Sequence, residues 1–225
     1  MKQDFYEIVS NERIAPSVYR MVLSGDTSPI TAPGQFVNIK IPELYLRRPI
    51  SICDWDDKTL TLIYKTVGEG TEELSRMKPG GRLHLLIALG NGYDTEPSGD
   101  TPLLVGGGVG VPPLYNLARK LLAEGREVQV VLGFNTAAEI FYADTFREAG
   151  ADVYVSTADG STGVKGFVTD AIREAGIEFD YFYACGPMPM LRALSLAYPA
   201  VQGELSFEER MGCGFGACMG CSCKT

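Results

Sequence analysis

The chain has 225 residues, 45% of them apolar and 21% charged, a composition that suits one large or two modest globular domains. Its 28 acidic residues outnumber its 20 basic ones and give a formal net charge of −8, which argues against nucleic acid or an anionic membrane as a partner. The sequence shows no apolar signal core and no apolar run long enough to span a bilayer, so we expect a cytoplasmic protein.

Residues 1–97 are predicted to form a small antiparallel β-barrel. Short runs rich in β-branched and aromatic residues alternate there with turn sequences. In the run 35–41 the alternation places Val37 on one face and Asn38 and Lys40 on the other. The predicted strands cover residues 5–9, 18–23, 35–41, 48–52, 59–65 and 82–87. The last of these contains His84, which as the single histidine of the chain excludes a multi-histidine metal site and is interpreted as structural.

The sequence Arg48-Pro49-Ile50-Ser51 opens one predicted strand and is the first of two local features there that can carry chemistry. An arginine offers a fork that grips phosphate, and a serine three residues later can place its hydroxyl beside a ring nitrogen. The alternative is that Arg47 and Arg48 form a solvated pair.

A second candidate stretch follows the fifth predicted strand. Bare amides at Gly70 and Thr71, at the start of a short helix with Thr71 as N-cap, would suit a pyrophosphate. A plain capped helix in a barrel connection is the alternative reading. The candidate residues of this stretch are Tyr64, Lys65, Thr66, Val67, Gly70 and Thr71.

The hydrophobic period changes after the polar segment 95–100. Strands alternate with helices from there on, which predicts right-handed βαβ crossovers and a parallel sheet over residues 98–203. The predicted strands cover 101–105, 127–134, 152–157 and 180–186, and the predicted helices cover 112–125, 138–150, 166–176 and 188–199.

The first strand-to-helix turn of this region carries Gly106, Gly107, Gly108 and Gly110, where such sheets bind a nucleotide. It departs from the dinucleotide fingerprint, because Val111 replaces the third glycine.

The second strand ends at Asn135 with neither an acid nor an arginine beside it, which favours NAD(H) over NADP(H) held at the carboxyl edge of the sheet rather than in a typical dehydrogenase site. Cys185, Gly186 and Pro187 end the last strand at the same edge. The alternative for Cys185 is a buried small hydrophobic residue.

Residues 204–225 are predicted to form a small [2Fe-2S] cluster segment. Cys213, Cys218 and Cys221 are spaced C-x4-C-x2-C, the opening of the plant-type pattern, and glycines interleave with them so that amide N–H groups can turn toward sulfur. A zinc knuckle, a disulfide hairpin and redox-active thiols remain alternatives.

Taken together, these motifs resemble the ferredoxin-reductase family, in which a flavin-binding barrel precedes a nicotinamide-binding α/β domain. The resemblance covers essentially the whole chain. It rests on the Arg48 to Ser51 motif, on Gly70-Thr71, on the glycine turn at 106–110 and on Cys185-Gly186-Pro187. It implies FAD on the barrel and NAD(H) on the sheet, with hydride transfer by the cofactors and no catalytic side chain.

Within that family, residues 206–225 resemble the electron-transfer subunits of NAD-dependent, type B dihydroorotate dehydrogenases of pyrimidine biosynthesis. The resemblance implies that Cys213, Cys218 and Cys221 are cluster ligands and that Cys223 is a neighbour. It also implies an FMN-containing, dihydroorotate-oxidising catalytic subunit as partner in a heterotetramer, with electrons passing from FMN through the cluster and FAD to NAD+.

The family's fourth cysteine lies roughly a dozen residues after the third, so we expect the segment to continue past Thr225, with Cys223 as the alternative ligand. Two other functions stay open. One is a ferredoxin-NAD(P) reductase-like subunit of a hydrogenase or a bifurcating transhydrogenase, and the other is a non-redox, zinc-binding interaction module.

Overall fold

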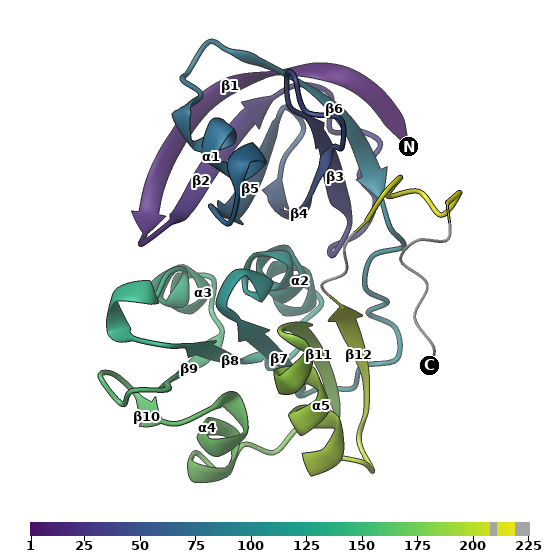
Figure 1. The fold of residues 1–225 in the computed structure, drawn as a ribbon. Helices are drawn as coiled ribbons and strands as arrows, with labels where there is room; N and C mark the ends of the chain where they lie inside the picture. The colour runs from purple at the N-terminus through teal and green to yellow at the C-terminus, as the bar shows by residue number, and fades with distance from the viewer. Residues whose placement is uncertain (208–210, 219–225) are drawn as a thin grey trace. The chain divides into compact units, whose positions relative to one another are not determined.

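The computed structural model describes residues 1–207 and 211–218 (Figure 1). It divides into two compact units. The first consists of Met1–Gly92 together with the described C-terminal residues 211–218, and the second begins at Tyr93. No helix within the described ranges is long and apolar enough to cross a membrane.

The first unit is a closed six-stranded antiparallel barrel, as predicted, with the strand order β1-β2-β5-β4-β3-β6. The first strand is longer than its sequence pattern suggests because it pairs with β2 along one part and with β6 along another. The strands are β1 (Lys2–Ala15), β2 (Val18–Ser24), β3 (Phe36–Lys40), β4 (Arg48–Trp55), β5 (Thr59–Lys65) and β6 (Arg82–Leu89).

The barrel core follows the period-2 pattern of its strands. Val37 and Ile39 of β3 point inward and are fully buried, whereas Lys40 on the opposite face is exposed. Asn38 shares the outer face with Lys40 and is nevertheless only 1% exposed. Something outside the barrel therefore covers Asn38.

A short helix, α1 (Glu69–Arg76), connects β5 to β6. The prediction that Thr71 is its N-cap is wrong, because the cap is Gly68 and Thr71 occupies the third helical position. The Thr71 hydroxyl still serves the helix start, since Oγ1 accepts hydrogen bonds from the N–H groups of Val67 (2.9 Å) and Gly68 (3.3 Å). The helix therefore begins at Glu69, three residues earlier than the sequence pattern suggested.

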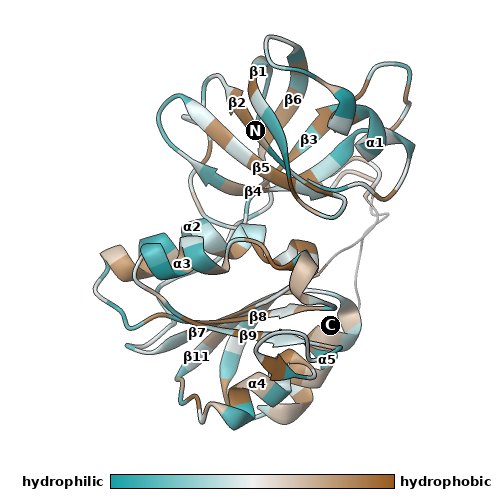
Figure 2. Ribbon diagram, turned by 90° about the vertical axis from the view of Figure 1, so that its left-hand side faces the viewer, coloured by the Kyte–Doolittle hydropathy of each residue, from teal (hydrophilic) through white to brown (hydrophobic). Residues whose placement is uncertain are grey.

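The second unit is a six-stranded parallel sheet with the order β10-β9-β8-β7-β11-β12, which confirms the predicted α/β fold. Its middle strands are mainly apolar, and β7 is buried over its whole length (Figure 2). The strands are β7 (Pro102–Gly107), β8 (Gln129–Phe134), β9 (Asp152–Thr157), β10 (Val164–Lys165), β11 (Tyr181–Gly186) and β12 (Gln202–Phe207).

Helices cover both faces of this sheet. In Figure 1, α2 and α3 lie on one face and α4 and α5 on the other, as right-handed crossovers in opposite directions from β7 require. The helices are α2 (Pro112–Ala123), α3 (Ala143–Glu148), α4 (Val168–Glu174) and α5 (Met188–Ala197).

Two parts of this unit differ from the sequence prediction. The helix expected over 138–150 is divided into a 3-10 turn, Ala137–Glu139, and the short α3, because Tyr142 between them adopts a left-handed φ of 64°. The edge strands β10 and β12 were not predicted, and β12 pairs in parallel with β11 across the expected boundary between residues 203 and 204.

Candidate functional site

The cysteine segment, of which the structure describes residues 211–218, folds around the sulfur of Cys213. Backbone N–H groups of Phe215 and Cys218 bind this sulfur and lower the pKa of the thiol to about 6, which favours the thiolate form. Gly214 adopts a left-handed φ of 76°, a conformation that turns the loop around the sulfur and that disfavours a residue with a side chain. Amide donors that converge on a thiolate are what an iron–sulfur cluster requires of its binding loop.

Cys218 lies next to Cys213, with a side-chain hydrogen bond between the two thiols and no disulfide. Among the residues that the structure describes, no group of three potential metal-binding side chains comes together. The third predicted ligand, Cys221, and its neighbour Cys223 lie outside the described residues. The part that is described fits the sulfur-rich, amide-lined half of a cluster site.

This segment sits on the barrel. The Nδ2 atom of Asn38 in β3 donates a hydrogen bond of 3.1 Å to the carbonyl oxygen of Cys213. The Asn38 side chain that faces outward from the barrel is therefore covered by the loop that carries the first two cysteines.

A second group of predicted residues meets at one end of the same barrel. The side chain of Arg48 lies so close to Gly70 that a Cβ atom added to Gly70 would stand 2.3 Å from Arg48 Nε. The Arg48 guanidinium and the N-terminus of α1 thus lie next to each other, although Arg48 and Gly70 are 22 positions apart in the sequence. A positive fork beside bare helix-start amides fits a pyrophosphate.

Two acidic residues of α1 pair with a base at the far end of the helix, whereas Glu69, its first residue, is exposed. Glu72 and Glu73 are exposed, and both pair with Arg76 in the last turn of the helix, with a Glu72–Arg76 separation of 4.0 Å. Their charges are drawn along the outer surface of the helix, away from its N-terminus.

The other predicted flavin residues take varied positions. Pro49, Ile50 and Ser51 continue β4 beyond Arg48 and are half-buried. Tyr64 is 2% exposed, packs in the barrel core and donates a 2.9 Å hydrogen bond to Asn11 Oδ1.

The remaining three predicted residues are Lys65, which ends β5, and the two residues that follow it. Lys65 and Thr66 are half-buried, and the Thr66 N–H donates to the Ser17 carbonyl. The Val67 side chain is 80% exposed at the entrance to α1.

In the second unit, the predicted glycine turn and the Cys185 motif are packed against each other. They end the adjacent strands β7 and β11, where the order of the sheet reverses, and open α/β sheets bind ligands at such a switch point. A Cβ atom on Gly110 would stand 2.1 Å from the Cys185 carbonyl oxygen, and one on Gly107 would stand 2.6 Å from Met190 Sδ. Only glycine fits at these two positions, because atoms of the Cys185 motif and of α5 already fill the space that a side chain would take.

The rest of the predicted turn follows the same geometry. Gly106 is buried at the end of β7, Gly108 opens a 3-10 turn, and Gly186 and Pro187 lead from β11 into α5. Cys185 itself is 4% exposed.

Tyr93 is a residue at this edge that the sequence did not single out. Its ring is 6% exposed and stands edge-on to that of Tyr183, with the centroids 5.6 Å apart. Burial raises the pKa of the Tyr93 hydroxyl well above its ordinary value, and the neighbouring Cys185 adds to the shift.

Glu139 is the clearest residue that sequence reasoning missed. Its Oε2 atom accepts hydrogen bonds from Asn135 Nδ2 (2.9 Å) and from the Asn135 N–H (3.4 Å). An acid therefore does stand at the end of the second strand, contrary to the expectation from the sequence. The signal was missed because the carboxylate comes from the 3-10 turn four residues later and not from the strand itself.

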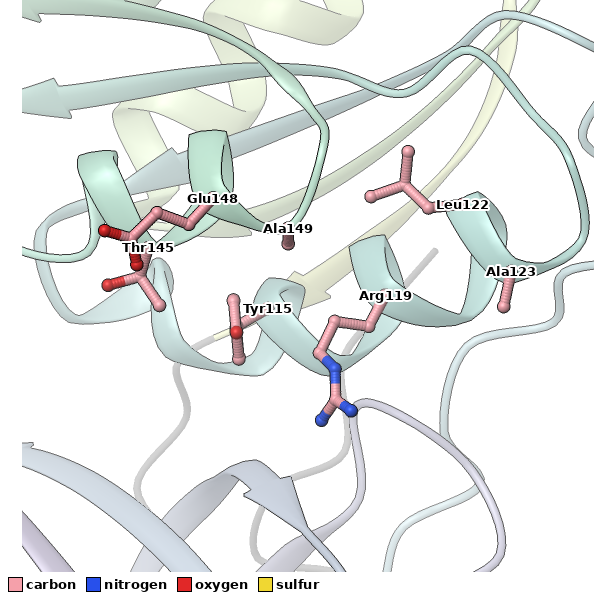
Figure 3. A pocket seen from close by; sticks show the side chains of 7 residues that line it. All are labelled: Tyr115, Arg119, Leu122, Ala123, Thr145, Glu148 and Ala149. Carbon is pink, nitrogen blue, oxygen red and sulfur yellow. The ribbon is translucent and has the colours of Figure 1, made fainter.

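Two surface hollows of the second unit lie away from this edge. One of about 440 Å3 runs between α2 and α3, where Figure 3 shows Tyr115 and Arg119 on α2 and Thr145 and Glu148 on α3. Another of about 490 Å3 is lined by residues of α4 and α5. Neither hollow contains a predicted cofactor residue, so backbone contacts and charge, not the size of a hollow, identify the candidate sites.

Comparisons with known proteins agree with this geometry. A family model described as "Oxidoreductase NAD-binding domain" matches residues 104–195. The dihydroorotate dehydrogenase B (NAD(+)) electron transfer subunit of Bacillus mycoides is 49% identical over 224 residues, which cover 96% of this chain and 86% of that protein. The subunit of the same name from Geobacillus sp. is 48% identical, covering 100% of this chain and 90% of that protein.

A solved structure is similar as well. An NADH-dependent reduced ferredoxin-NADP oxidoreductase, studied for flavin-based electron bifurcation, matches with a TM-score of 0.87 and 34% identity, over 96% of this chain and 80% of that one.

Proposed function

Because the chain belongs to the family of electron transfer subunits of NAD+-dependent dihydroorotate dehydrogenase B, an oxidoreductase of pyrimidine biosynthesis that uses FAD and NAD(H), we propose that it links a dihydroorotate-oxidising subunit to NAD+ through a [2Fe-2S] cluster and FAD. The family name implies a separate catalytic subunit. Our proposal adds that this partner carries FMN, that the complex is a heterotetramer and that it works in the cytoplasm.

The observation that carries the proposal is the contact of the cysteine segment with the barrel. Bound FAD supplies the exchange of electron pairs with NAD(H), and a bound cluster supplies single-electron transfer. The Cys213 thiolate with its amide donors is the described part of a cluster site, and the Asn38 contact places it on the same unit as Arg48 and Gly70.

The residues of each site have distinct proposed roles. Arg48 and the start of α1 hold the FAD pyrophosphate, with Ser51 at the flavin ring. The turn from Gly106 to Gly110 and the bare backbone at Gly186 admit NAD(H).

Cofactor choice is assigned to the end of β8. Glu139, held by Asn135, stands where an acid can accept a hydrogen bond from the ribose 2′-hydroxyl and repel a 2′-phosphate. This supports NAD(H) over NADP(H).

The test separates one-electron from two-electron function. The chain is co-expressed with the dihydroorotate-oxidising subunit, and Cys213→Ser is compared with Cys53→Ala, which changes a cysteine buried in the barrel wall. We expect Cys213→Ser to abolish dihydroorotate-dependent NAD+ reduction while NADH still reduces the flavin, and Cys53→Ala to retain both activities. Full dihydroorotate-dependent activity in Cys213→Ser would contradict the proposal.

A further inference from the structure

Asn38 is a polar side chain on the outer face of the barrel that behaves like a core residue. It is 1% exposed, whereas Lys40, two residues along the same face of β3, is exposed. The described cover is the cysteine segment, since Asn38 Nδ2 donates to the Cys213 carbonyl over 3.1 Å. This hydrogen bond joins residues 175 positions apart in the chain.

The fit between Asn38 and the segment is close. Gly214 is buried directly against the amide, and a Cβ atom at that position would stand 2.7 Å from Asn38 Nδ2 and 3.5 Å from Phe36 Cε2. The absence of a side chain at Gly214 thus lets the loop approach the barrel, in addition to allowing its left-handed backbone.

The backbone that carries Asn38 is itself fixed. Asn38 faces Pro49 across β3 and β4, and proline has no N–H to donate. Arg47 Nη1 donates to the Asn38 carbonyl (3.2 Å) and to the His84 carbonyl (3.3 Å), and Nη2 lies 2.9 Å from His84 Nδ1. Because arginine has only donors, His84 Nδ1 accepts this hydrogen bond, and His84 thereby holds the Arg47 side chain in place.

The amide of Asn38 is costly to the barrel on its own. Its Oδ1 atom is buried and has no hydrogen-bond partner among the described residues. An unpaired buried carbonyl costs more than one neutral hydrogen bond contributes, so an apolar side chain of similar size would serve the barrel at least as well. The benefit of asparagine here lies in the one donor it offers to the cysteine segment.

We propose that Asn38 is the positioning residue that anchors the cysteine segment to the barrel, and that Arg47 and His84 hold it for that task. That this anchor serves a cluster rests on the proposed function. The contact between Asn38 and the segment does not depend on that function. Asn38 touches the backbone of the segment and acts on the sulfur of Cys213 only through that backbone.

The experiment compares the full chain with Asn38→Leu, which removes both the donor and the unpaired oxygen, and with Asn38→Ala as a second, smaller variant. Lys40→Ala on the same face of the same strand is the matched control. Hydrogen exchange of residues 211–218 is measured in the cluster-free protein. Iron release to a chelator is measured after anaerobic reconstitution, with FAD content as the control for barrel integrity.

We expect both Asn38 variants to exchange faster in residues 211–218 and to release iron about ten-fold faster, with FAD content unchanged and Lys40→Ala like the parent. Parent-like exchange in both Asn38 variants would overturn the anchor. If the parent itself binds no iron, the cluster proposal fails, while hydrogen exchange still decides the anchor.

A double-mutant cycle checks the contact itself. Gly214→Ala introduces both backbone strain and a clash with Asn38 Nδ2, and only the strain persists when Asn38 is alanine. The effect of Gly214→Ala on exchange of the segment should therefore be smaller in the Asn38→Ala background. Equal effects in the two backgrounds would show that these residues do not meet.

Discussion

At the scale of single residues, the candidate sites depend on charged or ionisable groups that contact the backbone. The N–H groups around the sulfur of Cys213 lower the pKa of its thiol, whereas Arg48 lies against Gly70 at a helix start and donates to the carbonyl oxygen of Leu46. A single substitution at either residue therefore tests its site.

The thiol of Cys213 should titrate far below an ordinary cysteine. In the cluster-free chain, alkylation of Cys213 followed by peptide mass spectrometry across pH 5–9 should show a midpoint at about 6, against about 8.5 for an unperturbed thiol. The reaction rate at pH 7 should consequently be close to its plateau. A midpoint near 8.5 would show that the amide donors do not face the sulfur.

Removing the Arg48 fork should weaken FAD binding. A charge-assisted hydrogen bond contributes about 1.5–3 kcal/mol, so Arg48→Ala is expected to lower FAD affinity roughly 10- to 100-fold in an equilibrium titration followed by flavin fluorescence. Arg48→Lys should restore little, because an ammonium group lacks the planar fork. The control is Arg13→Ala, on an exposed part of β1. Unchanged affinity in Arg48→Ala would remove this residue from the site.

The titration of His84, the single histidine of the chain, predicts how the stability of the protein depends on pH. Burial lowers the pKa of His84 below 6.5, and Arg47 and Lys40 act in the same direction. As pH falls, the unfolded chain binds a proton at His84 before the folded chain does. The contribution of His84 to the free energy of unfolding is therefore complete above about pH 6.5 and is lost as pH falls through the pKa of His84 in the folded chain.

Urea unfolding between pH 7.5 and 5 should therefore show a steeper loss of the free energy of unfolding for the parent than for His84→Gln. Parallel curves for the two proteins would mean that His84 titrates alike in both states.

At the scale of elements, the two candidate nucleotide sites lie where strands end and helices begin. Gly110 is the tightest point, since its Cα hydrogen faces the Cys185 carbonyl at the boundary between β7 and β11. The close packing of these two strand ends defines the sheet edge that is proposed to receive NAD(H).

Gly110→Ala should separate these strand ends. The added Cβ would stand 2.1 Å from a backbone oxygen that cannot rotate away, and overpacking of this kind costs about 1–3 kcal/mol. We expect a lower Tm and a strongly reduced rate of flavin reduction by NADH, with FAD content unchanged. Gly108→Ala is the control, because no described atom lies within 4 Å of its Cβ and only its φ of 53° is strained. A parent-like Tm and a parent-like rate of flavin reduction in Gly110→Ala would contradict the strand separation.

Most elements could be predicted from the sequence because their pattern is local. The barrel strands alternate, and α2 carries Leu114, Leu117 and Leu121 on one buried face, with Pro112 at its start. The misses have local causes too. Tyr142 in a left-handed conformation shortened a helix, and β12 is a half-exposed edge strand whose identity depends on its pairing with β11.

The candidate sites were predicted residue by residue but not in their contacts. The sequence indicated Arg48, Gly70 and Cys213 separately, and the structure shows that Arg48 meets Gly70 and that Cys213 meets Asn38. The sequence identified Asn38 only as a polar residue on the outer face of a predicted strand. Contacts across 175 positions leave no periodic signal in one sequence, which is why this partner could not be found before the fold was known.

At the scale of the whole molecule, a barrel unit and a parallel-sheet unit each carry one candidate nucleotide site, and the cysteine segment belongs to the barrel unit. In the proposed function, single electrons enter at the cysteine segment and leave as a pair at the sheet unit, and this chain carries both candidate sites. The net charge of −8 and the absence of a second histidine fit a protein whose chemistry is carried by bound cofactors.

The most direct test of this account is a cofactor count on the full-length protein co-expressed with its dihydroorotate-oxidising partner. Absorption spectroscopy with quantified FAD and iron should give one FAD and about two irons per chain, the content of one [2Fe-2S] cluster, and dihydroorotate should reduce NAD+. A colourless protein that binds zinc and no flavin would contradict the account.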